Sequence, residues 1–342
     1  MAVDDNRRVP LYEGSTQYRN WRFSPDKLQE TRSSLNAAAV AGIRKAFEAD
    51  SAVPRTRQPG SSANVSFLTP EEENLLVKLY IGKISQLCGL FKFSEEVEAT
   101  AITYLKRFYL KNTVMDWHPK NVMLTALFLA TKTTNHPISL EFYASHIPKT
   151  TPSDVLDLEF LVAQSLGFEF SVWHAHRALW GLWLDIQTLP DISITTLSQV
   201  QEIALQQIRA SRLTDAELIY TPSQIALACL SLASSDLAKQ WAESKGSLSV
   251  LAIVENIQQL IAGEGTDPEV EAVREVDKRL RLCKNPEKVP GSKAYLAKKA
   301  EEEATALARR SKKADDVKKA MEAGDPFGDE LGMREGALDD DD

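Results

Sequence analysis

The amino-acid sequence predicts an all-α protein in which one helical domain occurs twice. Two long apolar segments are the main observation, because a helix that is apolar on every side belongs in the middle of a helical bundle. They run from Pro119 to Lys132 and from Pro222 to Ser235, and aligned without gaps they share five identical residues. Amphipathic helical patterns surround both segments, so we expect each to be the central helix of its own repeat.

The composition is that of a soluble globular protein, with 43% hydrophobic and 26% charged residues among 342. This length is sufficient for two domains of ordinary size. The amino end has no apolar signal core, and no run reaches the ~18 to 20 apolar residues that cross a bilayer. We therefore expect an intracellular protein without a membrane anchor. A formal net charge of -8 counts against nucleic acid as the main partner.

The cysteines and histidines indicate neither disulfides nor a metal site. Cys88, Cys229 and Cys283 are far apart and lie in helical patterns, which predicts reduced thiols packed as small hydrophobic side chains. Zinc needs four ligands at short spacings, and only His174 and His176 come close, next to tryptophans that favour a packing role. Since we find no glycine-rich phosphate loop and no paired nucleophile and base, the sequence predicts no catalytic residue and no cofactor.

Three segments precede the first repeat. Residues 1–14 have the character of a loose leader, and Ser24 followed by Pro25 predicts the start of a helix over Leu28–Phe47. The apolar stripe of this helix is thin, so we expect it to dock on the main body. Residues 50–66 contain two prolines and a Gly-Ser-Ser run, which predicts a flexible linker.

The first repeat begins at Thr69, where Pro70 and Glu72 complete a capping box with proline in the first turn. Apolar residues then follow helical spacing, at offsets of 0, 4, 7, 8 and 11 from Val97. We expect five helices in this repeat, and Glu159 lies in the last of them. They cover residues 69–89, 97–108, 119–132, 139–147 and 151–167.

In the second half, Thr221, Pro222 and Gln224 form another capping box ahead of the second central segment. Helical patterns around it cover residues 173–189, 194–212 and 248–261. The repeats differ in one important respect, because Ser235 stands at the position of Lys132. The charge at the end of the central helix is thus specific to the first half.

Lys132 and Glu159 are the candidate functional residues, since each places a charge on an apolar helical stripe. Phe128 lies one turn before Lys132, and Val155 and Val162 share the helical face of Glu159. A buried charge is costly unless it is paired, and removal of one member of a buried pair costs roughly 3 to 5 kcal/mol. The residues themselves leave two alternatives open, a polar clamp on an apolar face or two solvated charges.

Several longer motifs resemble the cyclin family. They are Tyr18–Ser24 in the leader, Arg107–Leu110, Val114–Met115 before His118–Pro119, the helix end Leu129–Lys132, and the run Leu213–Leu227. This resemblance covers about residues 15 to 285. It implies two tandem five-helix cyclin boxes with flanking helices at both ends. It also implies a protein that has no catalytic group and instead binds and activates a cyclin-dependent kinase.

The resemblance also assigns a binding site and partners. In the family, a lysine ending the third helix and a glutamate in the fifth helix of the first box contact the kinase, and these positions are Lys132 and Glu159 here. Apolar neighbours would supply contact area, namely Phe128, Leu129, Val162, Ala163 and Phe170. The implied partners are the cyclin-dependent kinase of TFIIH and a RING-containing assembly subunit, in the nucleus, without direct contact to nucleic acid or membrane.

Two alternatives share the duplicated helical fold, another transcriptional cyclin and a DNA-bound factor similar to TFIIB. The second would require a basic face and often a zinc ribbon, and the acidic balance and the scattered cysteines speak against it. An enzyme is the third class of protein to consider, and the sequence offers no set of residues that could carry a reaction.

The expected organisation has five parts. They are an N-terminal leader, helix and linker (1–66), a first box that binds the kinase (67–170), a second box (171–265), a C-terminal helix (266–285) and a charged tail (286–342). The tail lacks an apolar face, which predicts a disordered segment, with a solitary surface helix as the alternative. Its basic cluster Arg309–Lys313 fits a solvated segment better than a nuclear import signal.

Overall fold

The computed structural model of the protein describes residues 10–51, 65–190 and 194–322. Every regular element in these ranges is a helix, which confirms the predicted all-α class. None of the described helices is long and apolar enough to cross a membrane. The chain forms two compact units, of which one comprises Met1–Gly42 and Val65–Lys284 and the other Ile43–Asn64 and Asn285–Asp342. All the predicted site residues belong to the first unit.

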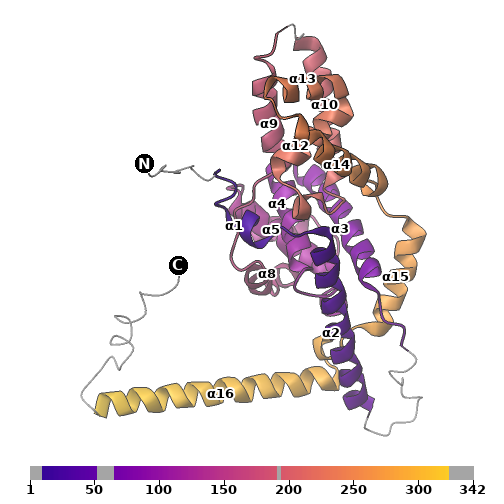
Figure 1. The fold of residues 1–342 in the computed structure, drawn as a ribbon. Helices are drawn as coiled ribbons and strands as arrows, with labels where there is room; N and C mark the ends of the chain where they lie inside the picture. The colour runs from indigo at the N-terminus through magenta and orange to yellow at the C-terminus, as the bar shows by residue number, and fades with distance from the viewer. Residues whose placement is uncertain (1–9, 52–64, 191–193, 323–342) are drawn as a thin grey trace, which may run out of the picture. The chain divides into compact units, whose positions relative to one another are not determined.

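The first repeat is organised around α5 (Pro119–Thr133), as its apolar sequence predicts (Figure 1). Pro119 occupies the first turn, and the ring of His118 caps the helix by accepting a hydrogen bond from the Lys120 amide. Every side chain from Val122 to Thr131 is buried. The helices that pack on α5 are α3 (Pro70–Phe91), α4 (Glu95–Phe108), α7 (Pro152–Leu156) and α8 (Glu159–Ser165), and α6 (Leu140–Ser145) packs on α7.

The structure divides the predicted fifth helix into two, so the described part of the first repeat has six helices instead of five. α7 ends at Leu156, and α8 begins at Glu159. The hydroxyl of Thr125 on α5 donates a hydrogen bond of 2.8 Å to the carbonyl oxygen of Val155. In a continuous helix that oxygen would accept from the Glu159 amide. The contact with the central helix therefore explains the break, and it makes Glu159 the first residue of a helix.

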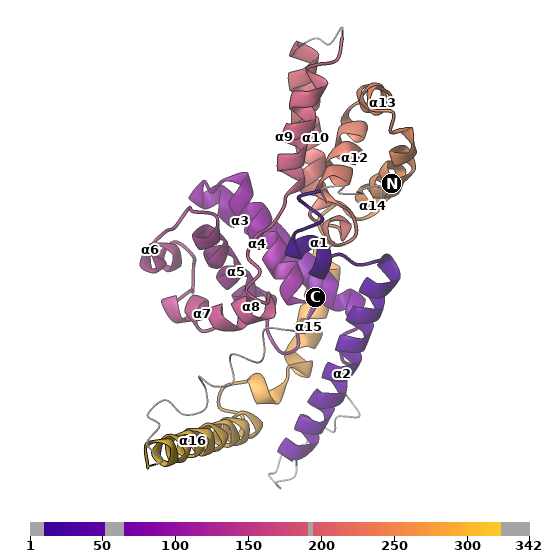
Figure 2. The same cartoon turned by 60° about the vertical axis from the view of Figure 1, so that its left-hand side comes forward.

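The second repeat follows the same plan around α12 (Pro222–Ala233), which begins with the predicted capping box of Thr221 and Gln224. Figure 2 shows α12 among the helices that pack on it. These are α9 (Ala175–Ile186), α10 (Ile194–Ser211), α11 (Ala216–Ile219), α13 (Ser235–Ser244) and α14 (Leu251–Glu264), with the short η2 (Leu248–Val250) before α14. Ser235 is the first residue of α13, so the position that aligns with Lys132 starts a new helix here.

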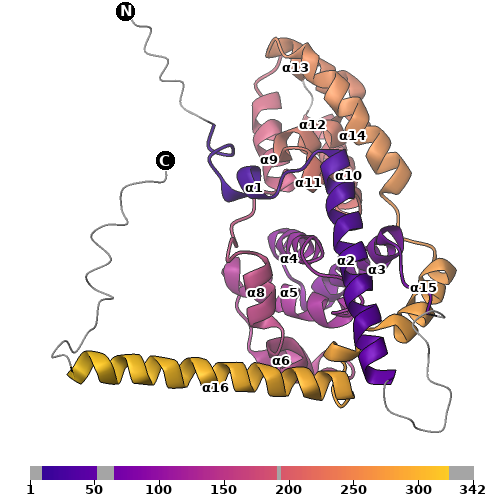
Figure 3. The same cartoon turned by 60° about the horizontal axis from the view of Figure 1, so that its bottom comes forward.

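The described part of the N-terminal leader, which we take as residues 10–24, lies where the two repeats meet (Figure 3). It contains α1 (Thr16–Asn20) and leads into α2 (Pro25–Ser51). An apolar cluster joins the leader and α2 to both repeats, and its buried members are Trp21, Leu28, Leu110 and Leu218. The amide of Phe23 also donates a hydrogen bond of 2.8 Å to the carbonyl oxygen of Leu218. The expected docking of this helix on the main body is thus confirmed at Leu28.

A further helix, α15 (Val270–Cys283), lies within the range expected for the C-terminal helix and packs on α3. There Arg279 forms an ion pair with Glu72, which belongs to the predicted capping box at the start of α3. The three cysteines are buried and form no disulfide. Burial raises the pKa of each thiol, which agrees with their expected role as small hydrophobic side chains.

In the second unit, η3 (Pro286–Lys288) precedes α16 (Lys293–Glu322). α16, a helix of 30 residues, is the alternative that we gave to a disordered segment over these residues. Alanine, lysine and glutamate have high intrinsic helix propensity, and this local preference is sufficient without an apolar face. Parts of three predicted segments lie outside the described residues. These are residues 1–9 of the leader, 52–64 of the flexible linker and 323–342 of the tail.

Candidate functional site

Lys132 and Glu159, which the sequence patterns select separately, meet at one surface of the first repeat. Lys132 is in the last turn of α5, Glu159 begins α8, and the lysine Nζ forms an ion pair with Oε1 of the glutamate. Both charges complement the helix dipoles, because a cation is favoured at a helix C-terminus and an anion at an N-terminus. The ammonium also lies 4.8 Å from the centroid of the Phe128 ring.

This pair is not buried. The side chain of Lys132 is 39% exposed and that of Glu159 is 25% exposed. The cost expected for breaking a buried pair therefore does not apply, because an ion pair in contact with solvent contributes only ~0 to 1 kcal/mol. The two groups keep hydrogen-bonding capacity, since an ammonium has three donors and a carboxylate has about four acceptor sites. They are suited to bind main-chain carbonyl and amide groups of a partner.

Most of the apolar residues predicted to supply contact area lie behind this surface. Phe128, Leu129, Val162 and Ala163 are buried, and the most exposed of them, Ala163, shows 8% of its surface. Phe170 is half-buried. In this conformation the four buried side chains support α5 and α8 from within. Their part in binding a partner stays a prediction.

Two aromatic side chains that the sequence analysis did not select form the outer surface. Phe160, next to Glu159, is 71% exposed, and Phe168 is 55% exposed. Their ring centroids are 6.2 Å apart, and the Phe168 ring lies 6.3 Å from that of Phe170. A signal for Phe160 was present in the sequence, because this aromatic residue is off the apolar stripe of its helix, where polar side chains are usual.

Tyr104 on α4 connects the two ends of this surface. Its hydroxyl donates a hydrogen bond of 2.7 Å to the carbonyl oxygen of Phe170 and lies 3.0 Å from the hydroxyl of Thr133. Burial raises the pKa of Tyr104 to about 12, so the hydroxyl stays protonated at neutral pH and remains a donor. Because Thr133 follows Lys132, the tyrosine links the end of α5 to the segment after α8.

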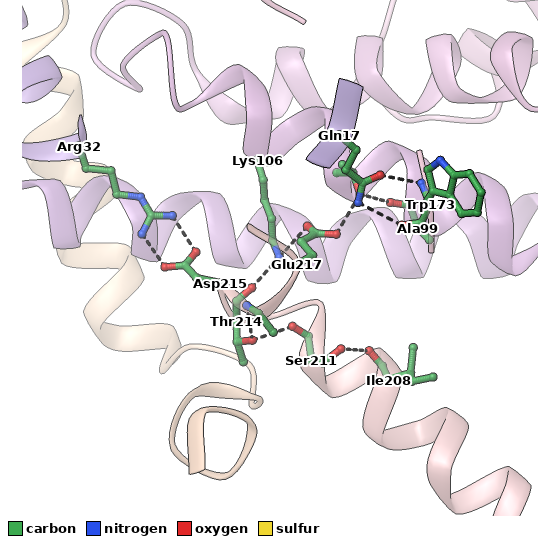
Figure 4. Close-up of polar contacts among 12 residues, drawn as sticks. Gln17, Arg32, Ala99, Lys106, Trp173, Ile208, Ser211, Thr214, Asp215 and Glu217 are labelled. Carbon is green, nitrogen blue, oxygen red and sulfur yellow. Dashed lines mark hydrogen bonds and ion pairs between the residues drawn. The ribbon is translucent and has the colours of Figure 1, made fainter. Parts of the chain in front are cut away.

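A second polar cluster lies at the junction of the two repeats (Figure 4). The Nζ of Lys106 on α4 lies 2.9 Å from Oε1 of Glu217 and donates a hydrogen bond of 2.6 Å to the carbonyl oxygen of Thr214. The hydroxyl of Thr103 donates to the other carboxylate oxygen of Glu217, at 2.9 Å. The Lys106 side chain is only 5% exposed. No local pattern predicts this cluster, because its members come from different repeats.

Arg32 on α2 adds a second link to the same segment of the second repeat. Its two terminal nitrogens donate hydrogen bonds of 2.6 and 2.7 Å to the carboxylate of Asp215 (Figure 4). Burial alone would raise the pKa of Asp215, but the hydrogen bonds and charge of Arg32 outweigh this effect and lower the pKa. The junction is thus held by partly or fully buried, charge-assisted contacts, which are stronger than neutral hydrogen bonds.

His174 and His176 pack at the start of the second repeat, as expected. Both are buried, their rings stack with centroids 5.2 Å apart, and Nε2 of His174 lies 2.9 Å from the hydroxyl of Thr100. Burial and the nearby positive charge of Arg212 lower the pKa of both, to about 4 for His176. The described residues contain no group of three or more histidine, cysteine or acidic side chains arranged to hold a metal ion.

Comparison with protein families gives two adjacent matches. Residues 62–171 match the family described as "Cyclin, N-terminal domain", and residues 174–262 match "Cyclin C-terminal domain". The chain is 32% identical over 296 residues to "Cyclin mcs2" of Schizosaccharomyces pombe, which covers 86% of this chain and 92% of that protein. It is 32% identical to "Cyclin-H" of Xenopus laevis, over 66% of this chain and 69% of that protein.

Solved structures give the same result. A chain of the CAK complex of Chaetomium thermophilum bound to ATP-gamma-S superposes with a TM-score of 0.74 and 31% identity, over 86% of this chain and 94% of that chain. A chain of the yeast TFIIK complex (Kin28/Ccl1/Tfb3) superposes with a TM-score of 0.61 and 32% identity, over 73% of this chain and 100% of that chain. Both similarities include sequence as well as fold.

Proposed function

The chain belongs to the cyclin family, and on this premise we propose that it is a cyclin H-like regulatory subunit of a protein serine/threonine kinase. It binds and allosterically activates the cyclin-dependent kinase of the CDK-activating kinase module of TFIIH. That kinase phosphorylates other cyclin-dependent kinases and the C-terminal domain of RNA polymerase II, in the nucleus. The protein has no catalytic group of its own. Its similarity to chains of two such complexes supports the proposal.

Two further statements about partners follow from the same premise. The third member of the assembly is a RING-containing subunit, and the yeast TFIIK complex, which comprises Kin28, Ccl1 and Tfb3, supports a third component. The protein makes no direct contact with nucleic acid, in keeping with its formal net charge of -8.

One observation carries the proposal. The Lys132–Glu159 ion pair and the exposed ring of Phe160 come from the ends of α5 and α8, which the buried core of the first repeat holds in place, and the exposed ring of Phe168 comes from the segment just after α8. This surface combines two charged groups with apolar area, as binding hot spots do. Lys132 donates to main-chain carbonyl groups of the kinase, and Glu159 accepts from main-chain amides.

The activation is a shift between two kinase conformations. A kinase transfers phosphate when its strand lysine pairs with the glutamate of its αC helix and its activation loop is ordered. A rigid surface that binds the inward position of αC more tightly than the outward one stabilises the active conformation by that difference in affinity. Lys132 and Glu159 set the register of αC, because each needs a main-chain group at one definite place.

The test is a titration of the full-length protein with the purified cyclin-dependent kinase of the TFIIH module, followed by an assay of kinase activity. We expect wild type to bind and activate the kinase. The double variant Lys132→Ala, Glu159→Ala loses two central contacts, so its Kd rises by about thirtyfold or more, as for a hot spot of about 2 kcal/mol.

A matched control is available in the second repeat, where Lys245 and Asp185 form an ion pair with side chains 42% and 36% exposed. The variant Lys245→Ala, Asp185→Asn is expected to bind like wild type. Equal binding by all three proteins would move the binding energy away from Lys132 and Glu159. If wild type neither bound nor activated the kinase, the proposed function itself would be wrong.

A further inference from the structure

The segment that joins the two repeats has two different sides. We call it the connector and define it as residues 167–173. After Phe168 it belongs to no regular element up to the start of α9, and its side chains contact two different parts of the molecule. Phe168 and Phe170 lie on the side of the candidate kinase surface, with ring centroids 6.3 Å apart. Glu169 and Trp173 contact the N-terminal leader instead.

The leader holds its side of the connector with four side-chain hydrogen bonds. The indole N–H of Trp21 and the amide of Asn20 both donate to the carboxylate of Glu169, the second at 2.6 Å. Gln17 accepts from the Trp173 main-chain amide at 2.6 Å and donates to the Trp173 carbonyl oxygen at 3.2 Å (Figure 4). Gln17 and Trp21 are 4% and 3% exposed, so their bonds are partly shielded from water, whereas the bond of Asn20 is exposed to solvent.

The buried side chain of Arg107 on α4 adds two contacts to these hydrogen bonds. The guanidinium of Arg107 lies 4.8 Å from the centroid of the Trp21 ring, and its Nη1 is 3.4 Å from the carbonyl oxygen of Glu169. Arg107 is 1% exposed and is the largest fully buried side chain among the described residues. The main chain and the side chain of Glu169 are therefore both held from the leader side of the connector.

The other side of the connector carries backbone strain. Phe168 has a φ of 58°, a conformation that is unfavourable for an aromatic residue. Its amide donates a hydrogen bond of 2.9 Å to the carbonyl oxygen of Ala163. Such a conformation persists only where surrounding contacts determine it. Glu169 is the next residue in the chain, so the leader holds the connector directly beside the strained position.

We propose that the N-terminal leader positions the aromatic part of the kinase-binding surface, and that the contact between Trp21 and Glu169 transmits this effect to Phe168. Trp21 and Glu169 are positioning residues that do not themselves contact the kinase. The inference rests on the proposed function, because the kinase is the partner that the surface would bind. The leader thereby becomes a place where kinase affinity can be changed from outside the binding surface.

The test compares two variants of the full-length protein. Trp21→Phe keeps an aromatic ring over Arg107 but removes the indole N–H that binds Glu169. Arg22→Gln, the control, removes a hydrogen bond of 3.2 Å from the leader to the carbonyl oxygen of Ile219 in the second repeat. The control weakens the docking of the leader without a change at the connector.

Two measurements separate positioning from general destabilisation. In the free protein, amide hydrogen exchange at Phe168 is expected to become about tenfold faster in Trp21→Phe and to stay unchanged in Arg22→Gln. The Phe168 amide is a remote reporter, because its hydrogen bond goes to Ala163 and not to the leader. The Kd for the kinase is expected to rise about two- to thirtyfold in Trp21→Phe alone.

A conservative variant provides the rescue. Glu169→Gln keeps an acceptor for the Trp21 N–H and is expected to lie between wild type and Glu169→Ala in both measurements. Unchanged exchange and affinity in Trp21→Phe would overturn the proposal, and so would equal losses in Trp21→Phe and Arg22→Gln. If wild type bound no kinase, the proposed function would fall together with this inference, whereas wild-type binding with an unaffected Trp21→Phe would overturn this inference alone.

Discussion

Two of the lysine–glutamate pairs among the described residues have different roles. Lys106 and Glu217 join the two repeats, and their side chains are 5% and 20% exposed. Lys132 and Glu159 join two helices of one repeat, and theirs are 39% and 25% exposed. A buried lysine–glutamate pair thus holds two parts of the fold together. An exposed pair contributes little to stability because water competes for its groups, and these groups stay available to a partner.

The two repeats show the same contrast. Their central helices align without gaps, but Thr125 and Lys132 of the first repeat correspond to Ala228 and Ser235 of the second. The packing around each helix depends on the spacing of its apolar residues, which both repeats share. The candidate site depends on a few polar residues that only the first repeat has. Duplication therefore explains the fold, and local differences explain why we expect one kinase-binding surface.

The largest effect is expected at the junction. The variant Lys106→Met leaves Glu217 without its buried partner, and we expect the free energy of unfolding to fall by about 3 to 5 kcal/mol. Urea unfolding of the full-length protein measures this change. A double variant, Lys106→Met with Glu217→Leu, should recover part of the loss because no unpaired charge remains. A loss below about 1 kcal/mol in the single variant would show that the junction pair behaves like a surface pair.

The second prediction concerns acid. Burial lowers the folded-state pKa of His176 to about 4 and also lowers that of His174, whereas the unfolded chain titrates near about 6.5. The unfolded state therefore binds protons first as the pH falls. The stability contributed by these two neutral histidines is complete above about pH 6.5 and is lost as the pH falls from there toward 4.

Urea unfolding at about pH 7 and at about pH 5 tests this expectation. Each histidine lowers the unfolding free energy by at most about 1.4 kcal/mol per pH unit. The variant His174→Gln, His176→Gln should show a shallower dependence, although not a flat one, since burial also lowers the pKa of His118. An unchanged slope in the double variant would place the acid sensitivity outside the start of the second repeat.

A smaller effect is expected where the central helices differ. Thr125→Val removes the hydroxyl that binds the Val155 carbonyl oxygen, and the buried carbonyl then loses a partner at a cost of about 1 to 2 kcal/mol. Thr131→Val is the matched control, since the Thr131 hydroxyl bonds locally to the Phe128 carbonyl oxygen at 2.7 Å. Thermal unfolding should show a larger loss of stability in Thr125→Val than in Thr131→Val. Equal losses would show that the break between α7 and α8 does not depend on the Thr125 hydroxyl.

The smallest change in stability is expected at the candidate site. The double variant Lys132→Ala, Glu159→Ala should unfold within about 1 kcal/mol of wild type, because the pair is in contact with solvent. Its affinity for the kinase should nevertheless fall as described above. Urea unfolding and kinase titration on the same preparation check both halves of this statement. A stability loss of about 3 kcal/mol would mean that the pair holds the fold, as Lys106 and Glu217 do.

Local patterns in the sequence predicted most helices of both repeats and the two charges of the candidate site. They missed α11 and α13 and did not separate α7 from α8. Capping boxes at Thr69 and Thr221 mark two helix starts, and the apolar segment before Lys132 marks a central helix. These features are encoded within a few turns of chain, where helical spacing and end caps act. The pairing of Lys132 with Glu159 joins two helices of the same repeat that are only 27 residues apart in the chain.

Only the tertiary structure decided which residues are buried and which distant residues meet. It placed Lys106 against Glu217 and Trp21 against Glu169, pairs that no local period connects. It also exposed Phe160 and Phe168 and covered Val162, although all are apolar. The physical reason is the same in each case, since burial and long-range contacts depend on which helix faces pack together, and residues far apart in the chain determine that packing.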